Sequence, residues 1–107
     1  NAAILDEVLG EENFLTMCGG GTRGGLLPTI TASVLKEPVA VNPVEEATSL
    51  GAAVFAAAGA GIYSDPRQAA KKMVPASLPV EPDHKASLVY QQTQERWFQL
   101  FKDFTKL

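Results

Sequence analysis

The chain has 107 residues, with 46% hydrophobic and 20% charged side chains and a formal net charge of −3. This length allows one domain at most, and the acidic balance, with no basic cluster longer than Lys71-Lys72, argues against a nucleic-acid-binding face. No apolar run approaches the roughly 18 to 20 residues that span a bilayer, so no membrane partner is expected. Cys18 is the only cysteine, which rules out an internal disulfide and favours a reducing, cytoplasmic compartment.

The first half of the chain alternates between helical and strand patterns. Apolar residues at helical spacing predict a helix over residues 2–9, which resembles the end of a helix in a longer chain. The short apolar run Phe14–Cys18 predicts a buried strand that leads into a cluster of glycines. Residues 26–35 return to helical spacing, with Pro28 acceptable in the first turn, and Pro38–Pro43 predicts a second short strand.

The second half is predicted to be helical. The pair Glu45-Glu46 opens an Ala- and Gly-rich helix that runs to about residue 63, because carboxylates favour the positive end of the helix dipole. The pair Asp65-Pro66 then predicts a new helix over residues 66–74, with Asp65 as its N-cap and Pro66 at its first position.

The end of the chain reads as a connector followed by a long helix. Residues 75–82 include three prolines, which predicts an extended connector rather than a helix or strand. A last helix is expected over residues 85–107. It carries an aromatic stripe along one side, which we interpret as core packing. The stripe consists of Tyr90, Trp97, Phe101 and Phe104.

This order of elements predicts an α/β fold with two short parallel strands and several helices. The helix over residues 26–35 would connect the strands by a right-handed crossover. Two parallel strands make a poor sheet on their own, because parallel sheets are normally covered on both faces. We therefore expect the chain to be a fragment that forms one side of a larger sheet.

The glycine cluster lies between the first predicted strand and the helix that follows it, with five glycines in the seven positions 19–25. Such a cluster is kept where the backbone needs a positive φ or touches a ligand. A P-loop is excluded, because Leu26-Leu27 stand where lysine and a hydroxyl residue are required. The spacing Gly19-x-Gly21-x-x-Gly24 matches a dinucleotide-binding fingerprint. However, the second strand ends at Asn42-Pro43, without the carboxylate that would bind the ribose.

Five short motifs follow one another from the glycine triplet onward: GGG at 19–21, ASVLK at 32–36, PV at 38–39, EATSLGAA at 46–53 and GAGIY at 59–63. This combination resembles the C-terminal region of the FGGY family of carbohydrate kinases. The resemblance covers nearly the whole chain. It implies the C-terminal portion of an actin-like (ribonuclease H-like) ATPase domain, with residues 1–107 as the C-terminal segment of the nucleotide-binding domain. Family members usually have glycine where this chain has Lys36.

The resemblance also implies a reaction, the transfer of the γ-phosphoryl group of ATP to a hydroxyl of a sugar or polyol. It assigns nucleotide contacts to Gly19, Gly20, Gly21 and Thr22. Arg23 is added as a candidate, with a phosphate contact and an exposed loop charge left equally open. No catalytic or metal-binding residue is assigned in this chain, because the resemblance puts the base, the sugar pocket and the Mg²⁺ ligands upstream.

The partners implied by the resemblance are ATP, a sugar or polyol, and the remainder of the kinase chain, and a homodimer is left open. The 107-residue piece alone is expected to be inactive. The alternative function is a nucleotide-binding or structural module without phosphoryl transfer.

Three other residues that often carry chemistry have structural interpretations here. Glu46 lies at a predicted helix start and is read as a cap or dipole partner. Cys18 is read as a small buried hydrophobe at a strand end. His84 has no companion at metal-ligand spacing and is read as a solvated surface residue.

Overall fold

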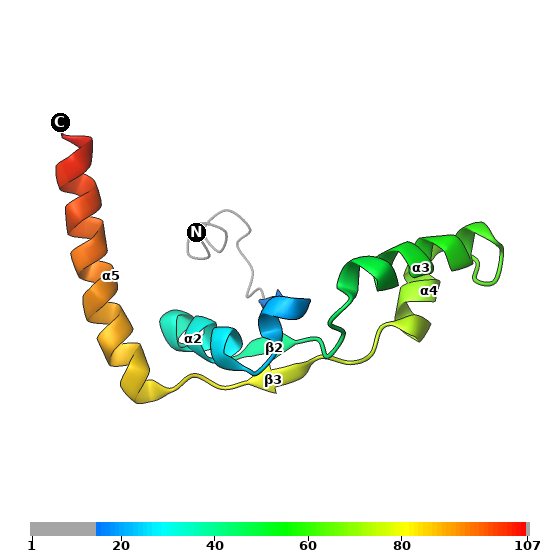
Figure 1. The fold of residues 1–107 in the computed structure, drawn as a ribbon, viewed down its shortest axis with the longest axis horizontal. Helices are drawn as coiled ribbons and strands as arrows, with labels where there is room; N and C mark the ends of the chain where they lie inside the picture. The colour runs from blue at the N-terminus through cyan, green and yellow to red at the C-terminus, as the bar shows by residue number, and fades with distance from the viewer. Residues whose placement is uncertain (1–14, 107) are drawn as a thin grey trace.

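The computed structural model describes residues 15–106, so the helix predicted over residues 2–9 lies outside the described part. Figure 1 shows the elements in chain order. They are β1 (Thr16–Met17), the 3₁₀ helix η1 (Gly20–Thr22), α2 (Leu26–Leu35), β2 (Val39–Val41), α3 (Ala47–Gly59), α4 (Pro66–Met73), β3 (Leu78–Val80) and α5 (His84–Thr105).

The three strands form one mixed sheet in the order β1-β2-β3. β1 pairs with β2 in parallel, as the sequence predicts, with Thr16 opposite Ala40. β3 pairs with β2 in the antiparallel direction, with Pro79 opposite Ala40. The prediction missed this third strand, which forms inside the proline-rich connector of residues 75–82.

Pro79 is accepted in β3 because its nitrogen faces away from the sheet. The N–H groups of Ala40 and Asn42 donate to the carbonyl oxygens of Leu15 and Met17, each at 2.9 Å. Even-numbered residues of β2 therefore direct their backbone groups toward β1, and odd-numbered ones toward β3. Pro79 lies opposite Ala40, so it belongs to a pair without hydrogen bonds between β2 and β3. Its missing N–H lies at the outer edge, where sheets tolerate proline.

α2 has the predicted bounds and connects β1 to β2. Pro28 is its third residue and is buried, at a position where an N–H group would have no partner within the helix. Ala32 and Ser33 are also buried, and α2 packs against β2 and α5. The helix ends at Lys36, whose backbone is left-handed with a φ of 62°.

α3 and α4 pack on each other at one end of the molecule (Figure 1). α3 is shorter than predicted at both ends, since it begins at Ala47 and ends at Gly59. Glu46 occupies the N-cap position, but its side chain makes no capping hydrogen bond. α4 begins as predicted, with Asp65 accepting a hydrogen bond from the Gln68 N–H at 2.8 Å.

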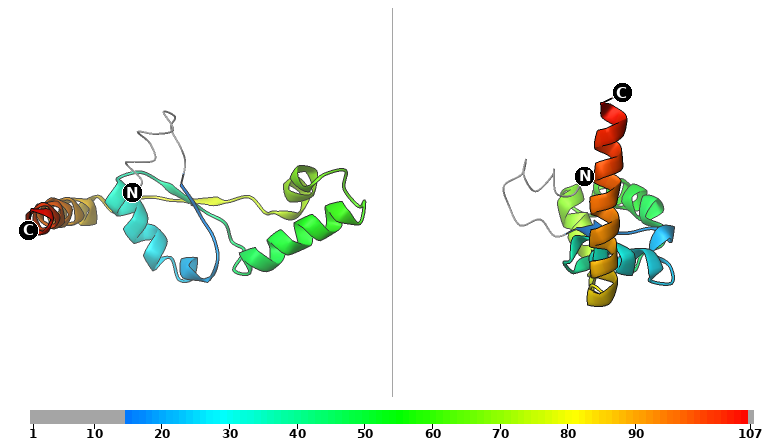
Figure 2. Two further views of the ribbon diagram at one scale, coloured as in Figure 1. Left: turned by 90° about the horizontal axis from the view of Figure 1, so that it is seen from above. Right: turned by 90° about the vertical axis from the view of Figure 1, so that its left-hand side faces the viewer.

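The molecule is elongated. α5 lies at the end opposite α3 and α4, and Figure 2 shows it rising away from the sheet. The radius of gyration is 18.0 Å, whereas a compact domain of this length has about 13 Å. Apart from Pro28, the buried apolar side chains of the described part are all small, and they are Ala32, Val39, Val54 and Ala69.

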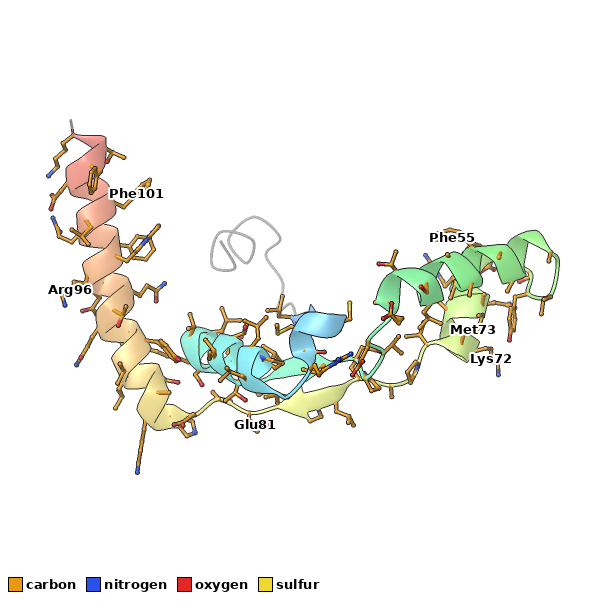
Figure 3. The ribbon with its side chains drawn as sticks, viewed as in Figure 1. Phe55, Lys72, Met73, Glu81, Arg96 and Phe101 are labelled. Atoms are coloured by element: carbon orange, nitrogen blue, oxygen red, sulfur yellow. The ribbon has the colours of Figure 1, made fainter. Side chains whose placement is uncertain are left out.

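The aromatic stripe of α5 is exposed, so the prediction that it packs in a core is wrong for the chain by itself. Trp97 is 57% exposed and Phe104 72% exposed, while Tyr90 is half-buried. Trp97 stacks on Phe101 with ring centroids 5.5 Å apart. Figure 3 shows Phe101 on a stretch of α5 with no other element beside it. The helical periodicity is correct, but no described residue covers the face that it creates.

Candidate functional site

The glycine-rich loop, residues 19–25, leaves the carboxyl end of β1. The 42–46 segment leaves the carboxyl end of the neighbouring parallel strand β2. The carboxyl ends of parallel strands meet at one edge of a sheet, and ligands of open α/β sheets bind outside that edge. The two segments therefore form the candidate site.

Three of the loop's five glycines need the freedom that glycine provides. Gly19, Gly24 and Gly25 have φ values of 87°, 77° and 75°, which other residues adopt only with strain. Gly20 and Gly21 lie in η1 and do not have a positive φ. A Cβ atom on Gly20 would meet no protein atom within 4 Å, so the fold itself does not require glycine there.

Thr22 fixes the shape of the first half of the loop. Its N–H and its Oγ1 both donate to the carbonyl oxygen of Gly19, at 3.1 and 2.8 Å. The N–H of Arg23 donates to the Gly20 oxygen at 3.2 Å, and the N–H of Gly25 donates to the Thr22 oxygen at 3.2 Å. The loop is therefore a series of tight turns held by its own backbone.

Several backbone N–H groups of the loop remain free for a ligand. Within residues 15–106, the N–H groups of Gly20, Gly21 and Gly24 donate to no acceptor. Gly25 is the N-cap of α2 and has no side chain to bond the first-turn N–H groups of that helix. Free N–H groups at a helix start bind phosphate and other oxygen acceptors, and backbone without Cβ atoms lets a flat ring approach closely. The loop thus presents backbone groups of the kind that bind oxygen acceptors and flat rings.

Arg23 forms an ion pair with Glu45 that joins the loop to the 42–46 segment. The pairing spans 22 positions in the chain, and sequence reasoning did not anticipate it. The two side chains are 70% and 49% exposed. Because an exposed pair of this kind contributes only about 0–1 kcal/mol, Arg23 can exchange Glu45 for a phosphate at little cost.

Asn42 is a buried polar residue of the site that sequence reasoning also missed. It is 8% exposed, and its side chain bonds both to the 42–46 segment and to the connector that follows α4. The sequence offered one signal, a polar residue directly after a short apolar strand.

Two further candidates lie at the surface. Cys18 is exposed, which corrects its interpretation as a buried hydrophobe. The reason is that β1 has two residues and lies at an edge of the sheet, so nothing covers its end. His84, the first residue of α5, is exposed, as predicted.

Searches for two other kinds of feature gave negative results within residues 15–106. These residues include no cluster of three or more His, Cys, Asp or Glu side chains arranged to hold a metal ion. No helix in this range has the length and apolar character needed to cross a membrane.

Comparison with known proteins gave a family and several relatives. Residues 11–60 match the FGGY family of carbohydrate kinases, C-terminal domain. The autoinducer-2 kinase of Escherichia coli strain K12 is 35% identical over 89 residues, which are 83% of this chain and 17% of the relative. The autoinducer-2 kinase of Salmonella paratyphi B is 36% identical over 93 residues, 87% of this chain and 18% of the relative. The chain thus spans less than a fifth of the length of these relatives.

The matched segment contains every part of the candidate site described above. It includes β1, the glycine-rich loop, α2, β2, the 42–46 segment and α3. The α/β arrangement agrees with the actin-like ATPase fold to which the C-terminal domain of this family belongs. On the match, the shared motifs and the fold, the chain belongs to the FGGY family of carbohydrate kinases.

Proposed function

We propose that this chain is the adenosine-side, ATP-binding segment of a carbohydrate kinase that transfers the γ-phosphoryl group of ATP to a sugar or polyol hydroxyl. One observation carries the proposal. The glycine-rich loop presents unbonded N–H groups and bare backbone at the carboxyl edge of the parallel strands, inside the segment that matches the kinase family.

Each loop residue has a part in holding the nucleotide. Gly19 turns the chain at its left-handed φ, and Thr22 locks that turn through the Gly19 carbonyl. Gly20 and Gly21 lie against the purine and ribose, where side chains would intrude. Arg23 leaves Glu45 and contacts a phosphate.

Positioning is the contribution of this segment to the reaction. Phosphoryl transfer is catalysed mainly by alignment and by electrostatic stabilisation of the transferred group. A loop that holds adenosine fixes where the γ-phosphoryl group lies relative to the acceptor hydroxyl. Mg²⁺, when bound, neutralises charge on the phosphates. Its ligands, the catalytic base and the sugar pocket belong to the rest of the kinase.

The acceptor is a sugar or polyol, and we favour autoinducer-2, because the relatives reported above are autoinducer-2 kinases. The use of ATP places the enzyme in the cytoplasm. The 107-residue chain by itself is expected to be inactive, because the proposal puts the acceptor site in the rest of the kinase.

Gly20→Val in the complete kinase tests the proposal. The new side chain meets no protein atom close to its Cβ position, so an effect on ATP reports on the ligand rather than on the fold. Overpacking against the nucleotide would cost about 1–3 kcal/mol, equivalent to a rise of roughly 5- to 150-fold in the KM for ATP. The KM for the acceptor should not change.

Gly59→Val is the matched control, because Gly59 also has no neighbour near its Cβ position but lies at the end of α3. This variant should keep the normal KM for ATP. If Gly20→Val lost affinity for the acceptor and kept its affinity for ATP, the loop would bind the acceptor and the proposed assignment would be wrong. ATP binding without any phosphoryl transfer in the complete protein would instead favour a nucleotide-binding module.

A further inference from the structure

The buried side chain of Asn42 joins two segments that are 33 positions apart. Its Nδ2 donates to the carbonyl oxygen of Pro75 at 2.8 Å, and its Oδ1 accepts from the N–H of Val44 at 3.1 Å. Its own backbone N–H donates to the Met17 oxygen at the end of β1. Asn42 therefore holds together the exit of β1, the 42–46 segment and the connector that follows α4.

A chain of hydrogen bonds leads from Asn42 to the glycine-rich loop. The carbonyl oxygen of Val44, whose N–H is held by Asn42, accepts from the N–H of Gly19 at 3.3 Å. The Gly19 oxygen in turn accepts from both the N–H and the Oγ1 of Thr22. The Asn42 amide thus holds the Pro43–Val44 peptide group, and the next peptide group along the chain carries the carbonyl that accepts from the first glycine of the loop.

Asn42 also links the two segments that connect the α3–α4 pair to the sheet. The 42–46 segment leads into α3, and Pro75 follows shortly after the end of α4. Figure 1 shows that these two segments are the connections of the pair to the sheet. The hydrogen bond between Asn42 and Pro75 ties the two connections to each other, so the orientation of the pair and the shape of the loop depend on one side chain.

The requirement for asparagine follows from the two partners. The Val44 N–H requires an acceptor at one side of the side chain, and the Pro75 carbonyl oxygen requires a donor at the other. A carboxylate would keep the first bond and repel the Pro75 oxygen, and a methyl group would lose both bonds. A buried backbone group left without its partner costs more than the bond itself contributes.

We propose that Asn42 is a positioning residue for the nucleotide. It does not touch ATP. It holds the glycine-rich loop in the conformation that receives adenosine and couples the loop to the α3–α4 pair. This inference rests on the proposed ATP-binding function of the loop.

Two substitutions in the complete kinase separate positioning from simple stability. Asn42→Ala releases the loop, so the KM for ATP should rise about threefold to tenfold, with the KM for the acceptor unchanged. Asn42→Asp retains the bond to Val44 but buries a carboxylate against the Pro75 oxygen. It should lower the unfolding temperature more than Asn42→Ala and raise the KM for ATP less.

Ser33→Ala is the matched control, since it removes buried side-chain hydrogen bonds in the last turn of α2, where its Oγ also donates to the Thr29 carbonyl oxygen at 2.6 Å. The Oγ of Ser33 accepts from the Asp83 N–H at 2.9 Å, at the start of α5. This variant should lose stability while the KM for ATP stays normal. A KM for ATP that simply follows the unfolding temperature across all three variants would overturn the inference.

Hydrogen exchange at the Gly19 N–H gives a readout that is independent of ATP. Asn42→Ala should accelerate this exchange and Ser33→Ala should not. Unchanged exchange in Asn42→Ala would refute the positioning role. Accelerated exchange in Asn42→Ala, together with a wild-type protein that fails to bind ATP, would uphold the positioning role and refute the proposed function of the loop instead.

Discussion

Arg23 and Glu45 pair across the entrance of the candidate site, and their exposure sets what the pair can contribute. Neither Arg23→Ala nor Glu45→Gln should change the free energy of unfolding by more than about 1 kcal/mol. Arg23→Ala should nevertheless raise the KM for ATP, because the proposed function has the guanidinium exchange Glu45 for a phosphate. The rise should shrink as ionic strength increases, since exposed charges are screened by salt. A normal KM for ATP at low ionic strength would leave Arg23 as a loop charge only.

Gly19 and Gly20 are adjacent but should respond differently to alanine. A Cβ on Gly19 has room, with the Glu45 carbonyl oxygen nearest at 3.9 Å, so any cost comes from the φ of 87°. With a ψ of −176°, Gly19 lies in a region that is essentially restricted to glycine, and an L-residue there costs about 1–3 kcal/mol. Gly20→Ala has neither a positive φ nor a close neighbour and should stay within about 0.5 kcal/mol of wild type. Urea unfolding of both variants checks this, and equal destabilisation would contradict it.

The sequence predicts the candidate site residue by residue only in part. The glycine-rich loop could be found from its composition, because clustered glycine is a local signal. The sequence does not show which of these glycines need a positive φ, because the adjacent residues Gly19 and Gly20 differ in this respect: Gly19 has a positive φ and Gly20 does not. The Arg23–Glu45 pair and the contacts of Asn42 join residues far apart in the chain, and no local pattern encodes them.

At the level of elements, α2 ends on the only non-glycine residue with a positive φ in residues 15–106. The N–H of Lys36 donates to the Ala32 oxygen, so Lys36 closes the helix in a conformation that favours glycine. Its Nζ also donates to Gln91 of α5 at 2.7 Å, but that contact is exposed.

Lys36→Gly should therefore stabilise the protein by about 1 kcal/mol through relief of the left-handed backbone. Lys36→Ala serves as the control, because it loses the same contact with Gln91 and keeps the strain. Thermal unfolding of the two variants gives the comparison. A glycine variant no more stable than the alanine variant would mean that the backbone at this position carries no strain.

Elements with local start and stop signals were predicted well. α2 has the expected bounds, and α4 starts where Asp65 and Pro66 indicate. β3 was missed because prolines argue against a strand, and only the pairing with β2 shows that Pro79 turns its nitrogen outward. The first turn of α3 was placed too early: the helix begins at Ala47 with Glu46 as its N-cap, and Glu45 lies before it, where its side chain pairs with Arg23.

The whole molecule exposes far more surface than a compact protein of its size. Its accessible surface is 8343 Å², against about 5,800 Å² for a folded monomer of this mass. Much of the excess is apolar and lies on α5, where Phe101 and its neighbours are uncovered (Figure 3). Helical periodicity correctly identified this apolar face but could not tell whether the same chain covers it.

The isolated 107-residue chain should therefore self-associate, because large exposed apolar patches are unstable in water. Size-exclusion chromatography should give an apparent mass that rises with concentration, and thermal melting should be broad. A clean monomer with a sharp cooperative transition would contradict this expectation.

Pro79 limits the size of the assemblies that can form by strand pairing at the edges of the sheet. A fibre needs two edges that accept new strands, so that each added chain leaves a fresh edge for the next. Here the outer side of β3 lacks a donor in its middle, and among residues 15–106 continuous pairing is available only along β1. Two chains that meet through β1 use up the open edges that the described strands offer, and pairing between these strands then stops. The proline thus steers misassembly away from polymerisation and toward closed pairs.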